Sequence, residues 1–182
     1  MKQRRTIRRY QEKDVTPALL NELMEIACRA STVGNMQTYS VVITRDAAMK
    51  EKLSPAHFNQ PMVKKAPVVL TFCVDLNRFS KWCEQRQAIP GYDNLQWFVT
   101  GAVDALLAAQ TFCVAAEEKG LGICYLGTTT YNPNQIIDAL QSLEVNEPVV
   151  FNGTDAPFFT SDENFLEFQL AGKYLLAHVE EV

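Results

Sequence analysis

Basic residues crowd the start of the sequence, where RRTIRRY places Arg4, Arg5, Thr6 and Arg8 within five positions. Guanidinium groups make bidentate contacts to phosphate, and a threonine hydroxyl can supply a further donor. This spacing fits the binding of one small phosphorylated ligand. Taken by itself, the segment could equally be a solvated basic turn or an arm that binds nucleic acid.

The charge is unevenly distributed along the chain. The first thirteen residues contain six basic side chains and one acidic side chain, whereas the other 169 contain eleven basic and twenty acidic ones. One short basic patch without interleaved aromatic residues, on an otherwise acidic protein, gives weak support to nucleic-acid binding. We therefore expect no nucleic-acid partner.

The sequence offers few groups for metal or hydrolytic chemistry. Neither histidine, His57 nor His178, has a second ligand at helical or hairpin spacing, and there is no GxSxG motif. The five cysteines form no CxxC pair, and three lie in apolar segments, which predicts buried, reduced thiols and a cytoplasmic protein. No apolar run approaches the roughly 20 residues that cross a bilayer, and no signal-peptide stretch follows the basic start, so we expect no membrane partner.

Hydrophobic periodicity and turn residues predict the elements that must position these groups. Helices are expected at about 17–30, 46–53, 101–120 and 132–140. Strands are expected at 40–44, 66–74, 122–127 and 147–151. The segment HFNQ, between Pro55 and Pro61, is expected to be a loop, and residues 76–96 show little periodicity. This order lacks the alternation of a doubly wound fold and predicts an α+β protein, an α/β sandwich, with residues 1–182 forming one domain.

Five segments, taken in order, resemble the nitroreductase family of FMN-dependent oxidoreductases. RRTIRRY looks like the family's R-R-S-x-R-x-F/Y, and ASTVGNMQTYS is similar to A-P-S-x-x-N-x-Q-P-W. The remaining three are KKAPVVLTFCVDLNR, AVDALLAAQTFCVAAEEKGLGICYLG and NPNQIIDAL. The resemblance covers about residues 4–150 and is strongest to the NADPH-preferring, oxygen-insensitive branch. It implies a mainly antiparallel or mixed sheet flanked by helices, in an intertwined homodimer.

The resemblance also implies roles for individual residues. Arg4, Arg5 and Thr6 match the positions that hold the FMN phosphate and the adjacent ribityl chain. Arg8 matches the basic residue near flavin N1 and O2, where a cation stabilises the negative charge that reduction brings.

Other matched positions surround the flavin ring. Gln37, with Asn35, matches a polar pair that reaches the flavin of the other subunit, and Gln60 matches an amide facing the pyrimidine side. The turn that covers the flavin and directs a backbone N–H towards N5 is matched by Tyr125, Gly127 and Thr128.

The function implied by the resemblance is reduction of nitroaromatic or quinone-type acceptors by NADPH or NADH, in a ping-pong two-electron cycle on FMN. The flavin sites would lie at the subunit interface. No protein nucleophile or acid–base residue is expected, because the flavin supplies the electron chemistry. The alternative is a flavin-binding protein of the same fold with little or no turnover.

Two departures from the family pattern bear on this expectation. Thr128-Thr129-Thr130 stands where a second glycine and then a basic residue are often found. Residues 152–182 contain neither the expected G-Y/W-P turn nor a K-x-R element, and Lys173 is their only lysine or arginine. The arginines of the opening segment would then hold the FMN phosphate nearly alone.

Overall fold

The computed structural model describes residues 4–91, 94–141 and 169–178. The α-helices of this part are α1 (Pro17–Ala27), α2 (Ala47–Leu53), α3 (Pro61–Lys65), α4 (Asn77–Gln85), α5 (Leu95–Glu118) and α6 (Pro133–Gln141). Short 3-10 turns are η1 (Val33–Asn35), η2 (Pro55–His57) and η3 (Gly127–Thr130). The strands are β1 (Tyr39–Thr44), β2 (Val68–Val74), β3 (Leu121–Tyr125) and β4 (Gln169–His178).

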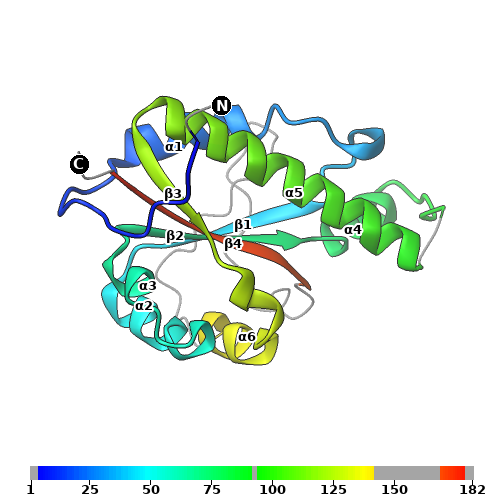
Figure 1. Ribbon diagram of the computed structural model, residues 1–182. Coiled ribbons are helices and arrows are strands. Elements are labelled where there is room, and N and C mark those ends of the chain that lie inside the picture. Colours follow the sequence, from blue (N-terminus) through cyan, green and yellow to red (C-terminus); the bar gives the residue numbers. More distant parts are fainter. Residues whose placement is uncertain (1–3, 92–93, 142–168, 179–182) are drawn as a thin grey trace.

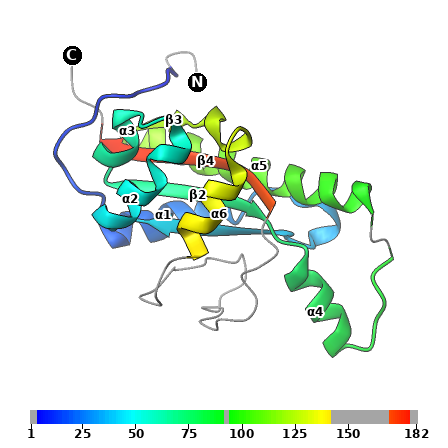
Figure 2. The same cartoon turned by 90° about the horizontal axis from the view of Figure 1, so that it is seen from below.

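The strands form one antiparallel sheet in the order β1-β2-β4-β3. Helices α1 and α5 cover one face of this sheet, and α2, α3 and α6 cover the other (Figure 1). Helix α4 lies beyond one end of the sheet (Figure 2). The described part of the chain is therefore a helix–sheet–helix sandwich, and the α+β fold with a mainly antiparallel sheet is confirmed.

Apolar side chains fill both sides of the sheet. On the α1 and α5 side, Leu23, Phe72 and Phe112 are almost fully buried, and the two phenylalanine rings meet edge to face with centroids 6.2 Å apart. On the opposite side, a smaller cluster joins α2 and α6 to the sheet. Strand β2 is buried along its whole length because it has helices on both faces, as its continuous apolar sequence predicts.

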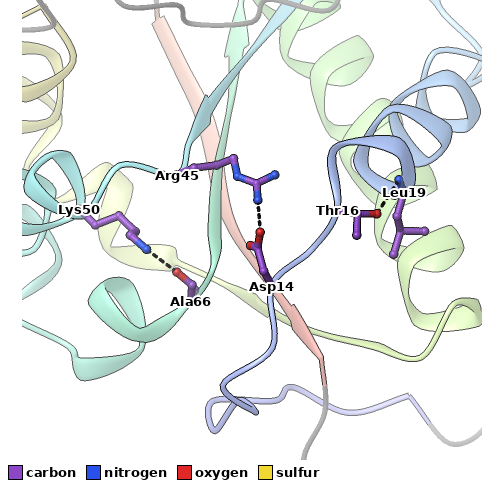
Figure 3. Close-up of polar contacts among 6 residues, drawn as sticks. All are labelled: Asp14, Thr16, Leu19, Arg45, Lys50 and Ala66. Carbon is purple, nitrogen blue, oxygen red and sulfur yellow. Dashed lines mark hydrogen bonds and ion pairs between the residues drawn. The ribbon is translucent and has the colours of Figure 1, made fainter.

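Local polar contacts hold the segment that leads from the basic arm into the fold (Figure 3). The carboxylate of Asp14 lies 2.6 Å from Nη2 of Arg45, at the end of β1. The hydroxyl of Thr16 then accepts the backbone N–H of Leu19 at 3.2 Å and caps α1, with Pro17 at the first helical position as predicted. The chain that follows the arm is thus fixed to the sheet before α1 begins.

Most of the predicted elements are present with shifted ends. Helix α1 ends at Ala27 instead of continuing to residue 30, and β3 ends at Tyr125, so that Gly127 belongs to the turn η3. Helix α5 begins six residues before the predicted start, because the Asn94 side chain accepts the N–H of Gln96 and caps the helix there. All five cysteines are free thiols, and the three in apolar segments, Cys73, Cys113 and Cys124, are buried as expected; Cys83 is buried as well.

The described residues also contain elements that the sequence did not predict. Two of them flank the loop predicted at HFNQ, because the 3-10 turn η2 ends at His57 and α3 begins at Pro61, and each begins at a proline, which suits a first helical position. Residues 77–85 form α4 although they lack a clear apolar repeat. Strand β4 lies within residues 152–182, for which no element is predicted; the strand expected at 147–151 lies outside the described residues.

Helix α5 also corrects the expectation that no apolar run approaches membrane-spanning length. By length and composition alone it could cross a membrane. Such a signal is also typical of a core helix, and here Ala105, Ala108, Phe112 and Ala116 are buried in the core. The small alanines allow the helix to lie close to the sheet.

Candidate functional site

The basic N-terminal segment, residues 4–13, is called the basic arm here, and it runs along the outer edge of β3. Strand β3 is at the edge of the sheet, and the backbone N–H of Ile7 donates to the carbonyl of Ile123 at 3.0 Å. In Figure 1 the arm is the dark blue segment beside β3. Arg5, Thr6 and Arg8 are exposed there. The edge of β3 therefore carries the group of residues predicted to bind phosphate.

Arg4 contacts Tyr125, another predicted site residue. Its guanidinium carbon lies 5.8 Å from the centroid of the Tyr125 ring, and its Nε lies 3.3 Å from Oε2 of Glu117 at the end of α5. The Tyr125 hydroxyl donates to Oε1 of Gln110 at 2.7 Å. Partly exposed ion pairs contribute only about 0–1 kcal/mol, so Arg4 can exchange Glu117 for a phosphate at small cost.

Arg8 and Tyr10 continue the arm from β3 towards α3. Burial raises the pKa of the Cys124 thiol, and the charge of Arg8 and a hydrogen bond from it act in the opposite direction. The Tyr10 ring packs on a cluster that contains Met62 and Val63 of α3, and burial raises the pKa of its hydroxyl. The arm thereby connects the end of α5 with the segment that carries Gln60.

The turn η3 and the segment around Gln60 form the second part of the site. The backbone N–H of Gln60 donates to the carbonyl of His57 at 3.1 Å, and Nδ1 of His57 lies 2.6 Å from Oγ1 of Thr128. Gly127 is exposed, and a Cβ added to it would meet no atom within 4 Å. Open space at this glycine, two positions after the Tyr125 that Arg4 contacts, fits the predicted position of a planar ligand with a phosphate.

Asn35 and Gln37 lie on a different part of the molecule. Both have left-handed backbone conformations, with φ of 54° and 52°, in the loop between α1 and β1. Arg78 of α4 donates to the backbone carbonyl of Gln37, and Nε2 of Gln37 donates to the side-chain oxygen Oδ1 of Asn35 at 3.5 Å. Asn35 is exposed and Gln37 is partly exposed, so this loop presents both residues at the surface.

Asp104 of α5 fixes this loop from beneath. Its fully buried carboxylate accepts the N–H of Val33 at 2.9 Å, the N–H of Thr38 at 3.2 Å and the hydroxyl of Thr38 at 3.0 Å. Arg4 binds near the other end of the same helix, at Glu117. Thirteen helical residues separate the two anchors, which corresponds to about 20 Å along the axis. One chain therefore does not bring Asn35 and Gln37 together with the other eight predicted residues.

Sequence reasoning missed Asp104 and His57. Asp104 is the only charged residue between positions 95 and 116, and a lone acid in an apolar helix is a signal for a buried, hydrogen-bonded carboxylate. His57 was considered only as a metal ligand, and its actual partner, Thr128, is 71 positions away. A contact of this kind has no local signature.

An apolar stripe remains exposed along α5. Its first three residues are four positions apart, and its last two lie three and four positions after the third, which places all of them on one face of the helix. They are Leu95, Val99, Val103, Leu106 and Leu107, each between 41% and 75% exposed. Contiguous apolar surface of this kind commonly marks an interface with another protein.

The sequence is similar to that of known proteins. The model of the Nitroreductase family matches residues 1–151. An FMN reductase (NADPH) of Bacillus subtilis strain 168 is 34% identical over 140 residues, which are 76% of this chain and 56% of that protein. The chain thus spans a little over half the length of this relative.

Solved structures extend the similarity to the described fold. A putative oxidoreductase from Bacteroides fragilis NCTC 9343 shares 56% identity with a TM-score of 0.81, over 100% of this chain and 65% of the other. The NfrA1 nitroreductase from B. subtilis shares 28% identity with a TM-score of 0.76, over 96% of this chain and 63% of the other.

Proposed function

Because the chain belongs to the nitroreductase family, we propose that the protein is an FMN-dependent oxidoreductase that takes electrons from NADPH or NADH. The observation that carries this proposal is the basic arm along β3, where Arg4 contacts Tyr125 at the end of the strand, two positions before the exposed Gly127. The names of the similar proteins support it, since they include an FMN reductase (NADPH). The acceptors we propose are nitroaromatics or quinones, reduced in a ping-pong cycle.

The residues present fit FMN chemically. Arg4 and Arg5, with Thr6, would hold the phosphate and ribityl chain, and Arg8 would lie at the pyrimidine edge as a fixed positive charge. When bound, FMN would accept and pass on the electrons. The chain's own groups would bind the flavin and orient it. Gln60 would direct its amide to the ring, and the backbone N–H at Gly127 would be a donor in a turn that is already folded.

The site is proposed to be completed by a second subunit. Asn35 and Gln37 lie about 20 Å along α5 from the Arg4 anchor in their own chain, so they would contribute to a flavin held by the partner chain. The exposed stripe on α5 supplies apolar surface for such contact. We therefore propose an isologous homodimer with two equivalent sites, and a cytoplasmic protein.

FMN titration of the purified protein tests the proposed function. We expect bound flavin whose visible absorbance bleaches on anaerobic addition of NADPH and returns on addition of a quinone. Flavin that binds without bleaching would instead support the alternative, a binding protein with little turnover. A protein that ignores added FMN would contradict both.

The arginines can be tested with a charge-matched control. Arg4→Ala combined with Arg8→Ala should raise the Kd for FMN at least about 100-fold, because two charge-assisted contacts are lost. Arg9→Ala combined with Lys13→Ala removes the same charge from exposed positions of the same arm. This control should change the Kd by less than about threefold if position matters more than net charge.

A further inference from the structure

A buried histidine connects two segments of the proposed site. His57 ends η2 and its side chain is fully buried. Its carbonyl accepts the N–H of Gln60, and its Nδ1 is 2.6 Å from Oγ1 of Thr128. The ring tautomer decides which of these two atoms is the donor. One residue thus bonds both to the segment that carries Gln60 and to the turn η3.

Neighbouring contacts join the same two segments. Nδ2 of Asn132, just after η3, donates to the carbonyl of Ala56 at 3.1 Å. The rings of Phe58 and Tyr131 meet edge to face with centroids 6.1 Å apart. Of these side-chain contacts between the two segments, from His57, Asn132 and Phe58, the one from His57 reaches Thr128, which is itself predicted to lie at the flavin.

We propose that His57 is a positioning residue, which fixes Gln60 and the Gly127–Thr128 turn relative to one another so that both meet the same ligand. The inference rests on the proposed function, because the ligand in question is FMN. Through Thr128 the imidazole holds the turn in one conformation, and through its own carbonyl it holds the start of α3. Donors that are oriented before the ligand arrives need no reorganisation when it binds.

Conservative and non-conservative substitutions separate this role from packing. Thr128→Val keeps the shape of the side chain but leaves the buried Nδ1 of His57 without this partner, whereas Thr128→Ser keeps a hydroxyl. His57→Leu fills part of the space without a polar atom. His57→Asn places an amide atom near the position of Nδ1 and can restore the bond.

The first measurement is FMN affinity by fluorescence titration. Thr128→Val and His57→Leu should each weaken binding about tenfold, and the double variant should be no worse than either single one, because both remove the same bond. Thr128→Ser and His57→Asn should recover most of the affinity. Thr44→Val, at a buried threonine at the end of β1, is the matched control and should bind like the wild type. Additive losses without recovery by Ser and Asn would overturn the proposal.

The second measurement needs no flavin and uses amide hydrogen exchange of the unliganded protein. In Thr128→Val, which leaves His57 itself intact, the amides of Gly127–Thr130 and of 60–63 should both exchange about tenfold faster. Faster exchange in η3 alone would mean that His57 does not couple the two segments, and the inference would fail. If the wild type binds no FMN, the proposed function fails while this result still decides whether His57 couples them.

Discussion

At the scale of single residues, a buried carboxylate determines where Asn35 and Gln37 lie. Asp104 accepts three hydrogen bonds from the loop before β1, one from Val33 and two from Thr38. A buried charge is tolerated only when it is paired or hydrogen-bonded in this way. The loop and the carboxylate therefore depend on each other.

Replacing Asp104 should release the loop and destabilise the protein. Asp104→Ala leaves two backbone donors and one hydroxyl without their acceptor, so we expect the free energy of unfolding to fall by about 3 kcal/mol. Urea denaturation followed by circular dichroism measures the change. Asp138→Ala, on an exposed position of α6, is the control and should lie within about 0.5 kcal/mol of the wild type. Equal stability of the two variants would contradict this account.

The buried thiol of Cys113 makes the free energy of unfolding depend on pH in the alkaline range. Burial raises the pKa of Cys113 from 9.0 to about 11, against the opposing effects of a hydrogen bond to Tyr125 and the charge of Arg4. Between these values the unfolded chain loses the proton and the folded chain keeps it, so stability falls as the pH rises. Relative to Cys113→Ala, the wild type should lose about 1.4 kcal/mol between pH 8 and pH 10. Parallel pH curves in urea denaturation would show that the thiol does not contribute.

At the scale of elements, local signals were sufficient for much of the fold. Thr16-Pro17 marks the start of α1, and the apolar run 68–74 has the composition of a strand buried on both faces. Strand β4 had no such signal. Its sequence includes Gly172 and Lys173, and it is a strand because it pairs with β2 and β3 on its two sides.

The site was predictable only in part, because some of its contacts, like the pairing of β4, join residues that are far apart in the sequence. The resemblance to a family selected Arg4, Tyr125 and Thr128, and the structure shows Arg4 against Tyr125. Their roles towards FMN stay predictions. The residues that hold the site segments in place, Asp104 and His57, act across 66 to 71 positions of sequence. Such contacts follow from packing, which periodicity and spacing do not describe.

Close approach of α5 to β2 requires a glycine. A Cβ on Gly101 would lie 2.6 Å from Cγ1 of Val74 and 3.3 Å from the carbonyl oxygen of Thr38. Gly101→Ala should therefore lower the free energy of unfolding by about 1–3 kcal/mol in spite of alanine's better helix propensity. At Gly91 an added Cβ meets nothing within 4 Å, so Gly91→Ala is the matched control. Thermal unfolding measures both, and a stabilised Gly101→Ala variant would contradict the prediction.

At the scale of the whole molecule, α5 has two functions in the proposed dimer. One of its faces packs on the sheet and carries Asp104, and another presents the exposed apolar stripe. The helix that would meet the partner chain therefore also holds the loop with Asn35 and Gln37. In a dimer built on this stripe, α5 would couple the association of the two chains to the positions of the Asn35 and Gln37 side chains.

Charges on the stripe should separate the proposed dimer. Val103→Glu combined with Leu106→Glu would place two carboxylates of each chain in the apolar interface, where desolvation is costly. Sedimentation equilibrium should then show a monomer, with FMN affinity reduced as well. Ile89→Glu, at a position that is 93% exposed and lies outside α5, is the control and should leave the dimer intact. An unchanged mass for the double variant would place the interface elsewhere.

The order of strands also governs how the protein is made. Strand β4 separates β2 from β3, although β2 ends at Val74 and β4 begins only at Gln169. At ribosomal rates, β2 emerges about 5 to 20 s before the strand that covers its second edge. An open edge of this kind is where strands of other chains can add. The sheet therefore closes well after β2 has been made, and the nascent chain has to be kept apart from its neighbours until then.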